Sequence, residues 1–333
     1  MDQNLARLVI FIAVVFTACK KNPAPTPVNN EPIPTETVYS LFNTSNSALV
    51  DNAVRGLAFD NSGVLWVATQ NGVSSYNGST WIAYDSSALS FPSNKFNCIA
   101  VDQSNVIWVG SNNGLLKYDG SSWQVYNTGN SGLPANKIRS LAVDQANVLW
   151  IGTFSGGGLA RFDGVSWSSW TPSTSALPNN SVGALTVDEN NLVWVGTGGG
   201  LSSFDGTTFT TYNVTNSGLP SNSVYCVVTD SSGVKWVGTN AGLSRFDDVS
   251  WTTYNSSNSG LTFNLVRALA LHNNQIKWVC TEGGGLSVYD ESTWNTISPA
   301  GTNLPEGDIK CIAVDASGKK WIGTKNSGLV VIN

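Results

Sequence analysis

The sequence predicts an all-β fold, a seven-bladed β-propeller with four antiparallel strands in each blade. The main observation is a repeat of about 42 residues that holds several short strand-like runs, a pattern typical of propellers. A tetrad of the form Trp-Val/Ile-Gly-Thr begins at Trp66, Trp108, Trp150, Trp194, Trp236, Trp278 and Trp321. Successive tetrads lie 42, 42, 44, 42, 42 and 43 residues apart.

Four short strands account for each repeat. In the first repeat we expect them at 54–59, around the tetrad at Trp66, at 72–76, and around the aromatic pair Trp81 and Tyr84. The composition agrees, because only 12% of the residues are charged and the chain is rich in turn-forming residues, with 33 glycines.

The chain ends predict how the ring closes. The last repeat stops after its third strand, so its fourth strand is missing. Tyr39 and Phe42 precede the first tetrad at the spacing of the fourth-strand aromatic pair, and Phe42 lies 24 residues before Trp66, the distance found in every repeat. We therefore expect the N-terminal strand to supply the outer strand of the seventh blade, which hides the edge of an open array.

The first residues have the features of a targeting segment. Arg7 precedes an apolar run at 8–16, and Thr17-Ala18-Cys19 follows. A run this short is typical of a signal peptide rather than a membrane span. We interpret 1–18 as a lipoprotein signal peptide, Cys19 as the lipid attachment site, 19–35 as a proline-rich linker and 36–333 as the propeller. The alternative is an ordinary signal peptide with an incidental Cys.

Two repeated positions have structural explanations. An Asp ends the first strand in six repeats and is followed three residues later by Gly or Asn, which predicts a turn closed by the carboxylate; His272 replaces it in the sixth repeat. A calcium site would need more converging oxygens. A second position holds Asn or Gly in all seven repeats, as a left-handed backbone would require: Asn52, Asn94, Asn136, Asn180, Asn222, Asn264 and Gly307.

The four cysteines of the repeats occupy positions that hold small residues throughout. Cys98, Cys226 and Cys311 share one position in the first strand, and Cys280 takes a position in the second strand that is otherwise Gly or Ala. We interpret them as apolar fillers. A disulfide between Cys280 and Cys311 is the alternative in an oxidising compartment.

Repeats such as Val-Leu-Trp-Ile-Gly-Thr at 148–153 and Gly-Leu-Ser-Arg-Phe-Asp at 242–247 resemble two-component regulator propeller repeats, over essentially 36–333. The resemblance implies kinship with periplasmic sensor regions of hybrid histidine kinases from Bacteroidetes-type bacteria, for which glycan breakdown products are typical signals. Since no membrane helix or kinase region follows the repeats, we expect a free-standing lipid-anchored propeller. Repeat motifs transfer fold better than function.

Strand order predicts where ligands bind. The loops from the fourth to the first strand and from the second to the third lie on one face, which we name the top face. One position at the start of the innermost strand, beside the channel, holds Arg55, Asn97, Arg139, Gly183, Tyr225, Arg267 and Lys310. Together with Phe154 in a second-to-third loop, these residues (Gly183 excepted) are the candidate ligand-binding residues. The alternative is that Arg is merely tolerated there and pairs locally.

An enzyme is the weaker prediction. Streptogramin-lyase-like propellers share a similar repeat, but that resemblance implies His-dependent metal-assisted catalysis, and this chain has a single His. Carboxylate catalysis would fall to Glu282 and Asp308, for which spacing identifies no partners. We therefore expect no enzyme, no cofactor and no metal.

The function predicted is ligand binding at the cell envelope, with a glycan, an anionic small molecule or a partner protein bound through the top face. A structural or adhesion scaffold is the alternative. The net charge of −5 makes a nucleic-acid partner unexpected. We expect a monomer that contacts the membrane only through its N-terminal lipid, at the outer membrane, with the leaflet left open.

Overall fold

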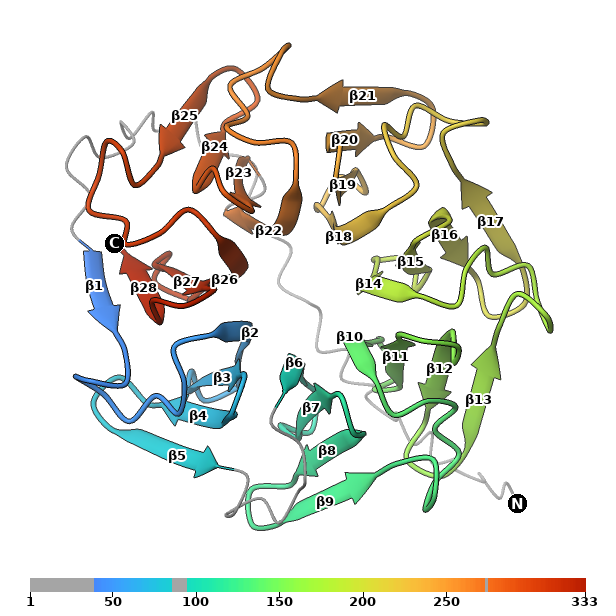
Figure 1. The fold of residues 1–333 in the computed structure, drawn as a ribbon. Helices are drawn as coiled ribbons and strands as arrows, with labels where there is room; N and C mark the ends of the chain where they lie inside the picture. The colour runs from blue at the N-terminus through green and yellow to red at the C-terminus, as the bar shows by residue number, and fades with distance from the viewer. Residues whose placement is uncertain (1–38, 86–94, 273–274) are drawn as a thin grey trace, which may run out of the picture. The chain divides into compact units, whose positions relative to one another are not determined.

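The computed structural model describes residues 39–85, 95–272 and 275–333. These ranges contain 28 strands and no helix, in seven four-stranded antiparallel sheets arranged as a ring (Figure 1). The predicted seven-bladed propeller is confirmed. The signal peptide, Cys19 and the linker lie outside the described residues, as does Asn94. No helix long and apolar enough to cross a membrane occurs in the described ranges.

Each blade runs from its innermost strand to its outermost. The strands of blades one to three are β2 (Val54–Phe59), β3 (Leu65–Thr69), β4 (Gly72–Tyr76), β5 (Trp81–Asp85); β6 (Phe96–Val101), β7 (Ile107–Ser111), β8 (Leu115–Tyr118), β9 (Trp123–Tyr126); and β10 (Ile138–Val143), β11 (Leu149–Thr153), β12 (Leu159–Phe162), β13 (Trp167–Trp170). Those of blades four and five are β14 (Val182–Val187), β15 (Val193–Thr197), β16 (Gly200–Phe204), β17 (Phe209–Tyr212); and β18 (Val224–Thr229), β19 (Lys235–Thr239), β20 (Gly242–Phe246), β21 (Trp251–Tyr254). Those of blades six and seven are β22 (Val266–His272), β23 (Ile276–Thr281), β24 (Leu286–Tyr289), β25 (Trp294–Ile297); and β26 (Ile309–Val314), β27 (Lys320–Thr324), β28 (Leu329–Ile332).

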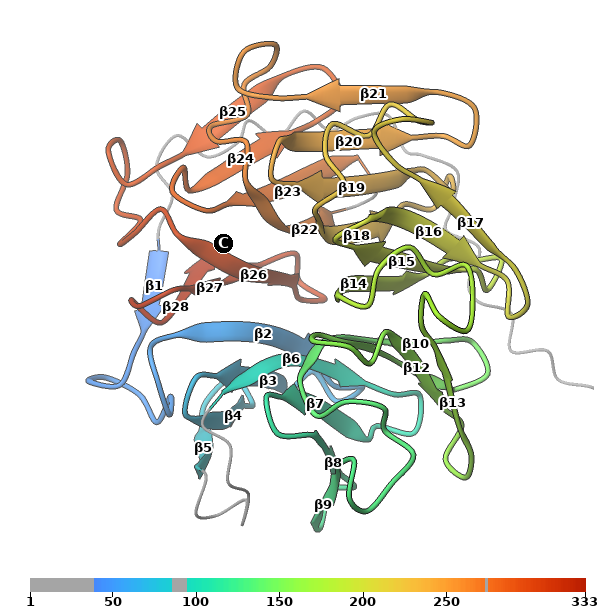
Figure 2. The same ribbon diagram turned by 45° about the vertical axis from the view of Figure 1, so that its right-hand side comes forward.

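Blade seven is completed by β1 (Tyr39–Phe42), as predicted. Strand β1 pairs antiparallel with β28, with Phe42 opposite Leu329, and both ribbon views show the two strands side by side (Figures 1 and 2). The Phe42 ring stacks on Trp321 with centroids 6.2 Å apart, as Tyr84 stacks on Trp66 at 5.7 Å in blade one. The N-terminal strand therefore replaces the missing fourth strand in packing as well as in hydrogen bonding.

The turn aspartates do more than the sequence suggests. The Oδ1 atom of Asp102 accepts the amides of Ser104 and Val106, and Oδ2 accepts the indole N–H of Trp108 at 2.9 Å. The same indole bond forms at Asp60, Asp144, Asp188, Asp230 and Asp315. Three residues after Asp102, Asn105 has a φ of 63°, which confirms the predicted turn. In blade six His272 takes the place of Asp, and the buried Nε1 of Trp278 has no hydrogen-bond partner.

The prediction of a left-handed backbone at the Asn52 position is wrong. None of its described members has a positive φ. The conserved amide instead acts as an acceptor: Oδ1 of Asn52 accepts the amide of Thr44, eight residues earlier, at 2.9 Å. Asn136, Asn222 and Asn264 hold the equivalent loops in the same way. In blade four the residue eight places earlier is Pro172, which has no N–H, and Oδ1 of Asn180 is buried without a partner.

The cysteines are small fillers, as predicted. A Cβ atom on Gly110 would lie 2.5 Å from Sγ of Cys98, so strand β7 must present a glycine there. Cys280 and Cys311 are free thiols, so the alternative of a disulfide does not hold. Burial raises the pKa of Cys98 and of Cys311 to about 12, which keeps these thiols protonated and unreactive.

Three blades place a lysine where the other four place an apolar residue: Lys235 in β19, Lys277 in β23 and Lys320 in β27. Each ammonium lies over a Trp ring of the preceding blade. Lys235 pairs with Asp248, and Lys277 pairs with Glu291. Both acids have a positive φ, 70° and 74°, at a turn position that is Gly in blades one to four: Gly78, Gly120, Gly164 and Gly206.

Candidate functional site

The candidate residues of the innermost strands are the unpaired residues of a ring of β-bulges. In every blade the register between the first and second strands skips one residue, for example between Val54 and Gly56. The seven skipped residues, which we name the bulge residues, are Arg55, Asn97, Arg139, Gly183, Tyr225, Arg267 and Lys310. A bulge re-aims a side chain and frees it from the strand ladder, which explains how one structural position tolerates such different residues.

A second residue accompanies each bulge residue, 15 places later in the second-to-third loop. This loop residue is held in place by the backbone: the amide of Gln70 donates to the carbonyl of Ala53, and the amide of Phe154 donates to that of Lys137. The seven pairs are Arg55/Gln70, Asn97/Asn112, Arg139/Phe154, Gly183/Gly198, Tyr225/Asn240, Arg267/Glu282 and Lys310/Lys325. Each blade thus has a bulge residue and a loop residue at a fixed offset, and in blade four both are glycines.

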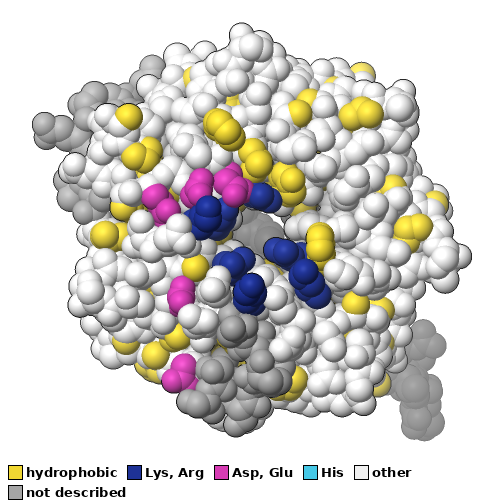
Figure 3. Space-filling model, viewed as in Figure 1, with side chains coloured by type: hydrophobic (Ala, Val, Ile, Leu, Met, Phe, Trp, Pro, Cys, Tyr) yellow, Lys and Arg dark blue, Asp and Glu magenta, His cyan; other side chains and the backbone are white. Residues whose placement is uncertain are grey.

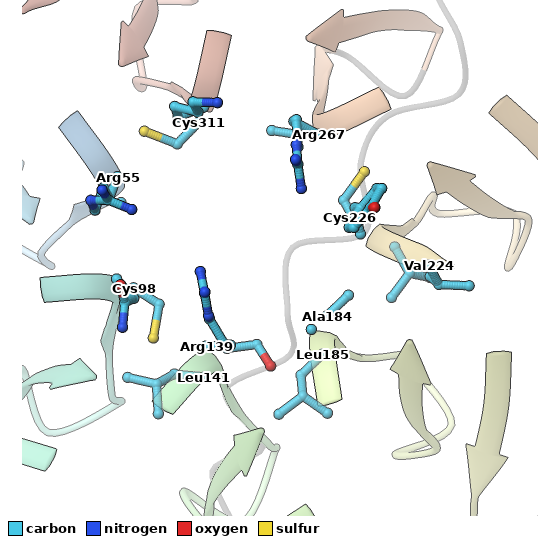
Figure 4. Close-up of a pocket in the computed structure, with 18 of the residues that line it drawn as sticks. Arg55, Cys98, Arg139, Leu141, Ala184, Leu185, Val224, Cys226, Arg267 and Cys311 are labelled. Atoms are coloured by element: carbon cyan, nitrogen blue, oxygen red, sulfur yellow. The ribbon is translucent and has the colours of Figure 1, made fainter. Parts of the chain in front are cut away.

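The bulge residues line a cavity of about 760 Å³ at the centre of the ring, which we name the channel mouth. Phe154 also lines it, so the structure brings together all the predicted site residues except Cys19. Lys and Arg side chains surround the opening, with Asp and Glu gathered on one side of it (Figure 3). Arg139 and Arg267 extend into the channel from opposite sides, with Arg55 between them on the wall (Figure 4).

Arg55 and Arg139 have uncharged partners. Arg55 donates from Nη2 to Oε1 of Gln70 at 3.0 Å, and its buried Nε has no acceptor. The Arg139 guanidinium lies 5.0 Å from the centre of the Phe154 ring, which also carries Lys137 at 4.6 Å. Burial, and then the nearby charge of Arg55, lowers the pKa of Arg139 from its ordinary value. Among the described residues neither guanidinium makes an ion pair, so this part of the mouth has uncompensated positive charge.

Arg267 and Lys310 are paired with one carboxylate. Glu282 contacts Arg267 through Oε2, and its Oε1 lies 3.0 Å from Nζ of Lys310. Arg267 also lies over the Tyr225 ring, 4.2 Å from its centre. Burial alone would raise the pKa of Glu282, but the bonds and charges of Lys310 and Arg267 outweigh it and lower the pKa. Glu282 is therefore ionised at neutral pH and offsets one of the two positive charges.

Blade four leaves a gap in the wall of side chains. Its pair is Gly183 and Gly198, and neither has a positive φ. A Cβ atom at Gly183 would meet only the Val224 carbonyl, at 3.4 Å, and one at Gly198 would touch nothing closer than 3.6 Å. The backbone therefore does not require glycine at either place, and the gap widens the mouth between Phe154 and Tyr225.

The acidic residues considered for catalysis have partners that the spacing did not identify. Glu282 holds Arg267 and Lys310, while Asp308 pairs with Lys325 at 2.9 Å. Because its pKa is lowered, the Glu282 carboxyl is a poor general acid at neutral pH. His272 lies at the far end of β22, where its ring is close to Gly318, away from the channel mouth. Among the described residues no three His, Cys, Asp or Glu side chains form a metal-binding group.

Sequence reasoning found the bulge position but missed the pairing. The signal was present, because the offset of 15 residues is constant in all seven repeats even though the loops beyond it differ in length. The bulge itself has no sequence signature here, since Arg, Asn, Gly, Tyr and Lys all occupy it.

Comparison with known families matches five segments of the chain to the two-component regulator propeller: residues 48–71, 90–113, 132–155, 176–199 and 218–241. Five of its seven repeats therefore match two-component regulator propeller repeats, the family that the sequence resembles. Each matched segment contains a bulge residue and its partner 15 places later, such as Arg139 and Phe154. The family repeat thus includes the whole unit that forms the channel mouth. A comparison with curated proteins gave no match.

Solved structures with the same fold belong to several classes. The extracellular domain of the hybrid two-component system BT3049 from B. thetaiotaomicron is 24% identical, with a TM-score of 0.76 over 89% of this chain and 42% of that chain. PorZ, a surface component of the type-IX secretion system of Porphyromonas gingivalis, is 19% identical, with a TM-score of 0.70 over 85% of this chain and 46% of that one. Virginiamycin B lyase from Staphylococcus aureus is 14% identical, with a TM-score of 0.71 over 90% and 99%.

The chain therefore shares a fold with an extracellular domain of a hybrid two-component system, a secretion component and a lyase. The chain spans less than half of the first two proteins. At these identities the similarity establishes the fold alone, and function must be argued from the residues of the channel mouth.

Proposed function

We propose that this protein is an envelope-anchored propeller lipoprotein that binds an anionic ligand at its channel mouth. The observation that carries the proposal is the state of Arg55 and Arg139. Both line the 760 Å³ cavity, and neither is ion-paired among the described residues. A guanidinium in a concave, partly dry site is suited to a carboxylate or sulfate, which it can bind with two parallel hydrogen bonds.

The neutral groups of the mouth suit the rest of such a ligand. Phe154 is 36% exposed and offers a ring face or edge, and Tyr225 lies across the gap in blade four. Asn97 also lines the mouth; its Nδ2 donates to Asn112 and to the Ile138 carbonyl, and its Oδ1 can accept a hydrogen bond from a hydroxyl group. A glycan, an anionic small molecule or an acidic segment of a partner protein fits this combination.

The proposed envelope location is supported by the sequence and by the proteins whose structures share this fold. The segment at 1–19 resembles a lipoprotein signal, and similar structures come from extracellular and surface proteins of related architecture. Detection of a lipid on Cys19 by mass spectrometry, lost in a Cys19→Ala variant, tests this part separately.

Calorimetric titration with D-glucuronate, and with neutral D-glucose as reference, tests the binding site. We expect glucuronate to bind more tightly than glucose, and Arg139→Glu to weaken glucuronate by roughly 10–100-fold, since a charge-assisted hydrogen bond contributes about 1.5–3 kcal/mol. Lys319→Glu is the matched control, because it makes the same charge change in the turn between β26 and β27, at the opposite end of the blade. Equal glucuronate affinity in the wild type and in Arg139→Glu would refute the proposal.

A further inference from the structure

In the three blades that have an Arg at the bulge, the loop residue 15 places later decides whether the positive charge is available to a ligand. Arg55 is accompanied by the amide of Gln70, and Arg139 by the ring of Phe154, so both keep a net charge. Arg267 is accompanied by the carboxylate of Glu282, which offsets its positive charge. The channel mouth therefore has two groups of cationic side chains. Arg55 and Arg139 contact no carboxylate of the described residues, whereas Arg267 and Lys310 both contact Glu282.

The carboxylate of Glu282 is fixed in position by its backbone and by its ion pairs. The backbone of Glu282 donates its amide to the Leu265 carbonyl at 3.0 Å, and the residue forms an antiparallel bridge with Asp308. Its side chain is only 24% exposed, and it joins blade six to blade seven by contacting Arg267 and Lys310 together. A carboxylate fixed between two cations from neighbouring blades occupies the place that an anionic group of a ligand would take.

Tyr225 completes this arrangement. Its ring covers one side of the Arg267 guanidinium, 4.2 Å from the ring centre, while Glu282 contacts Nε. The ring and the carboxylate thus take one face and the Nε edge of Arg267, and a second anion would have to approach beside Glu282. Arg139 extends into the channel as Arg267 does (Figure 4), but it is exposed and makes no ion pair with a described residue.

We propose that Glu282 is the specificity-determining residue for ligand charge, a built-in anion that restricts the channel mouth to ligands with a single anionic group. This inference rests on the proposed function. A ligand with one carboxylate or sulfate binds at Arg55 and Arg139 and leaves Glu282 undisturbed. A ligand with two such groups brings its second group against Glu282, where like charges repel at short range.

Anomalous diffraction from crystals soaked in bromide counts the anion sites directly. In the wild type we expect one bromide at Arg55 and Arg139 and none at Arg267 and Lys310. In Glu282→Gln, which keeps the size of the side chain, we expect a second bromide at Arg267 and Lys310. Asp308→Asn is the matched control, because it removes a neighbouring carboxylate that holds only Lys325, and it should add no bromide at Arg267.

Titration with D-glucuronate and D-glucarate tests the same point in solution, since the two differ by one carboxylate. We expect the wild type to prefer glucuronate, and Glu282→Gln to shift the ratio of the two affinities at least 10-fold toward glucarate. An unchanged ratio, or no second bromide in Glu282→Gln, overturns the role of Glu282 while the proposed function stands. Absence of bromide at Arg55 and Arg139 in the wild type, with glucuronate binding unaffected by Arg139→Glu, overturns both.

Discussion

The strained acid Asp248 should stabilise the protein only because Lys235 is buried beside it. The Lys235 side chain is 4% exposed and pairs with Asp248, whose own side chain is 63% exposed. Asp248 has a φ of 70°; at the equivalent positions blade four has Gly206 in place of Asp248 and the buried Val193 in place of Lys235. At these two positions blade four therefore pairs an apolar residue with a glycine, and blade five pairs a lysine with an acid.

The magnitude of the effect follows from two opposing terms. Asp248→Gly removes left-handed strain of about 1 kcal/mol. It also leaves the Lys235 ammonium without its partner, which costs about 3 kcal/mol, the lower end for a buried pair because Asp248 is exposed. The net expectation is a loss of about 2 kcal/mol in the free energy of unfolding, or about 3 °C in Tm for a propeller of this size.

A double-mutant cycle separates the pair from the strain. Lys235→Val together with Asp248→Gly copies blade four and should return the free energy of unfolding to within about 1 kcal/mol of the wild type, with a coupling of about 3 kcal/mol. Urea unfolding followed by tryptophan fluorescence and by circular dichroism measures all four proteins. As a control, Gly206→Asp adds the strain without a lysine and should cost about 1 kcal/mol. If Asp248→Gly is as stable as the wild type and the coupling is zero, the reasoning is wrong.

Two buried atoms without partners allow stabilising substitutions. His272→Asp should give the Trp278 indole the acceptor that six other blades provide, and raise the free energy of unfolding by about 1 kcal/mol in thermal or urea melts; a loss of stability would contradict it. Pro172→Thr should restore an amide donor to Oδ1 of Asn180 and add up to about 1 kcal/mol, offset in part by the greater freedom of the unfolded chain. The gain should vanish when Asn180→Ala is added, and its persistence there would show that the amide plays no part.

The candidate site was predictable in composition but not in organisation. The repeat aligned Arg55, Arg139, Arg267 and Lys310 at one position, and strand order put that position at one end of the ring. Their partners could not be assigned, because Glu282 reaches Lys310 across a blade boundary and not along its own strand. Which cations stay available depends on these contacts between blades.

The repeated polar residues were likewise predictable in position but not in the contacts that they make. The Asn52 position was recognised as conserved within the chain, but its role was misjudged. Asn is common both in left-handed backbone and as a side-chain acceptor, and only the bond from the Thr44 amide distinguishes the two. The turn aspartates were explained by local amides, whereas their bond to the indole six residues later needs two strands to be paired.

The sequence by itself determined the blade number, the strand order and the closing strand, because a repeat with constant spacing leaves one way to pair neighbouring segments and hide the free edge. Phe42 alone, 24 residues before Trp66, specified how the ring closes. Only the tertiary structure decided which charges face the channel unpaired. Bulges, buried orphan atoms and ion pairs between blades depend on distances between chain segments, and no periodicity within one segment reports those distances.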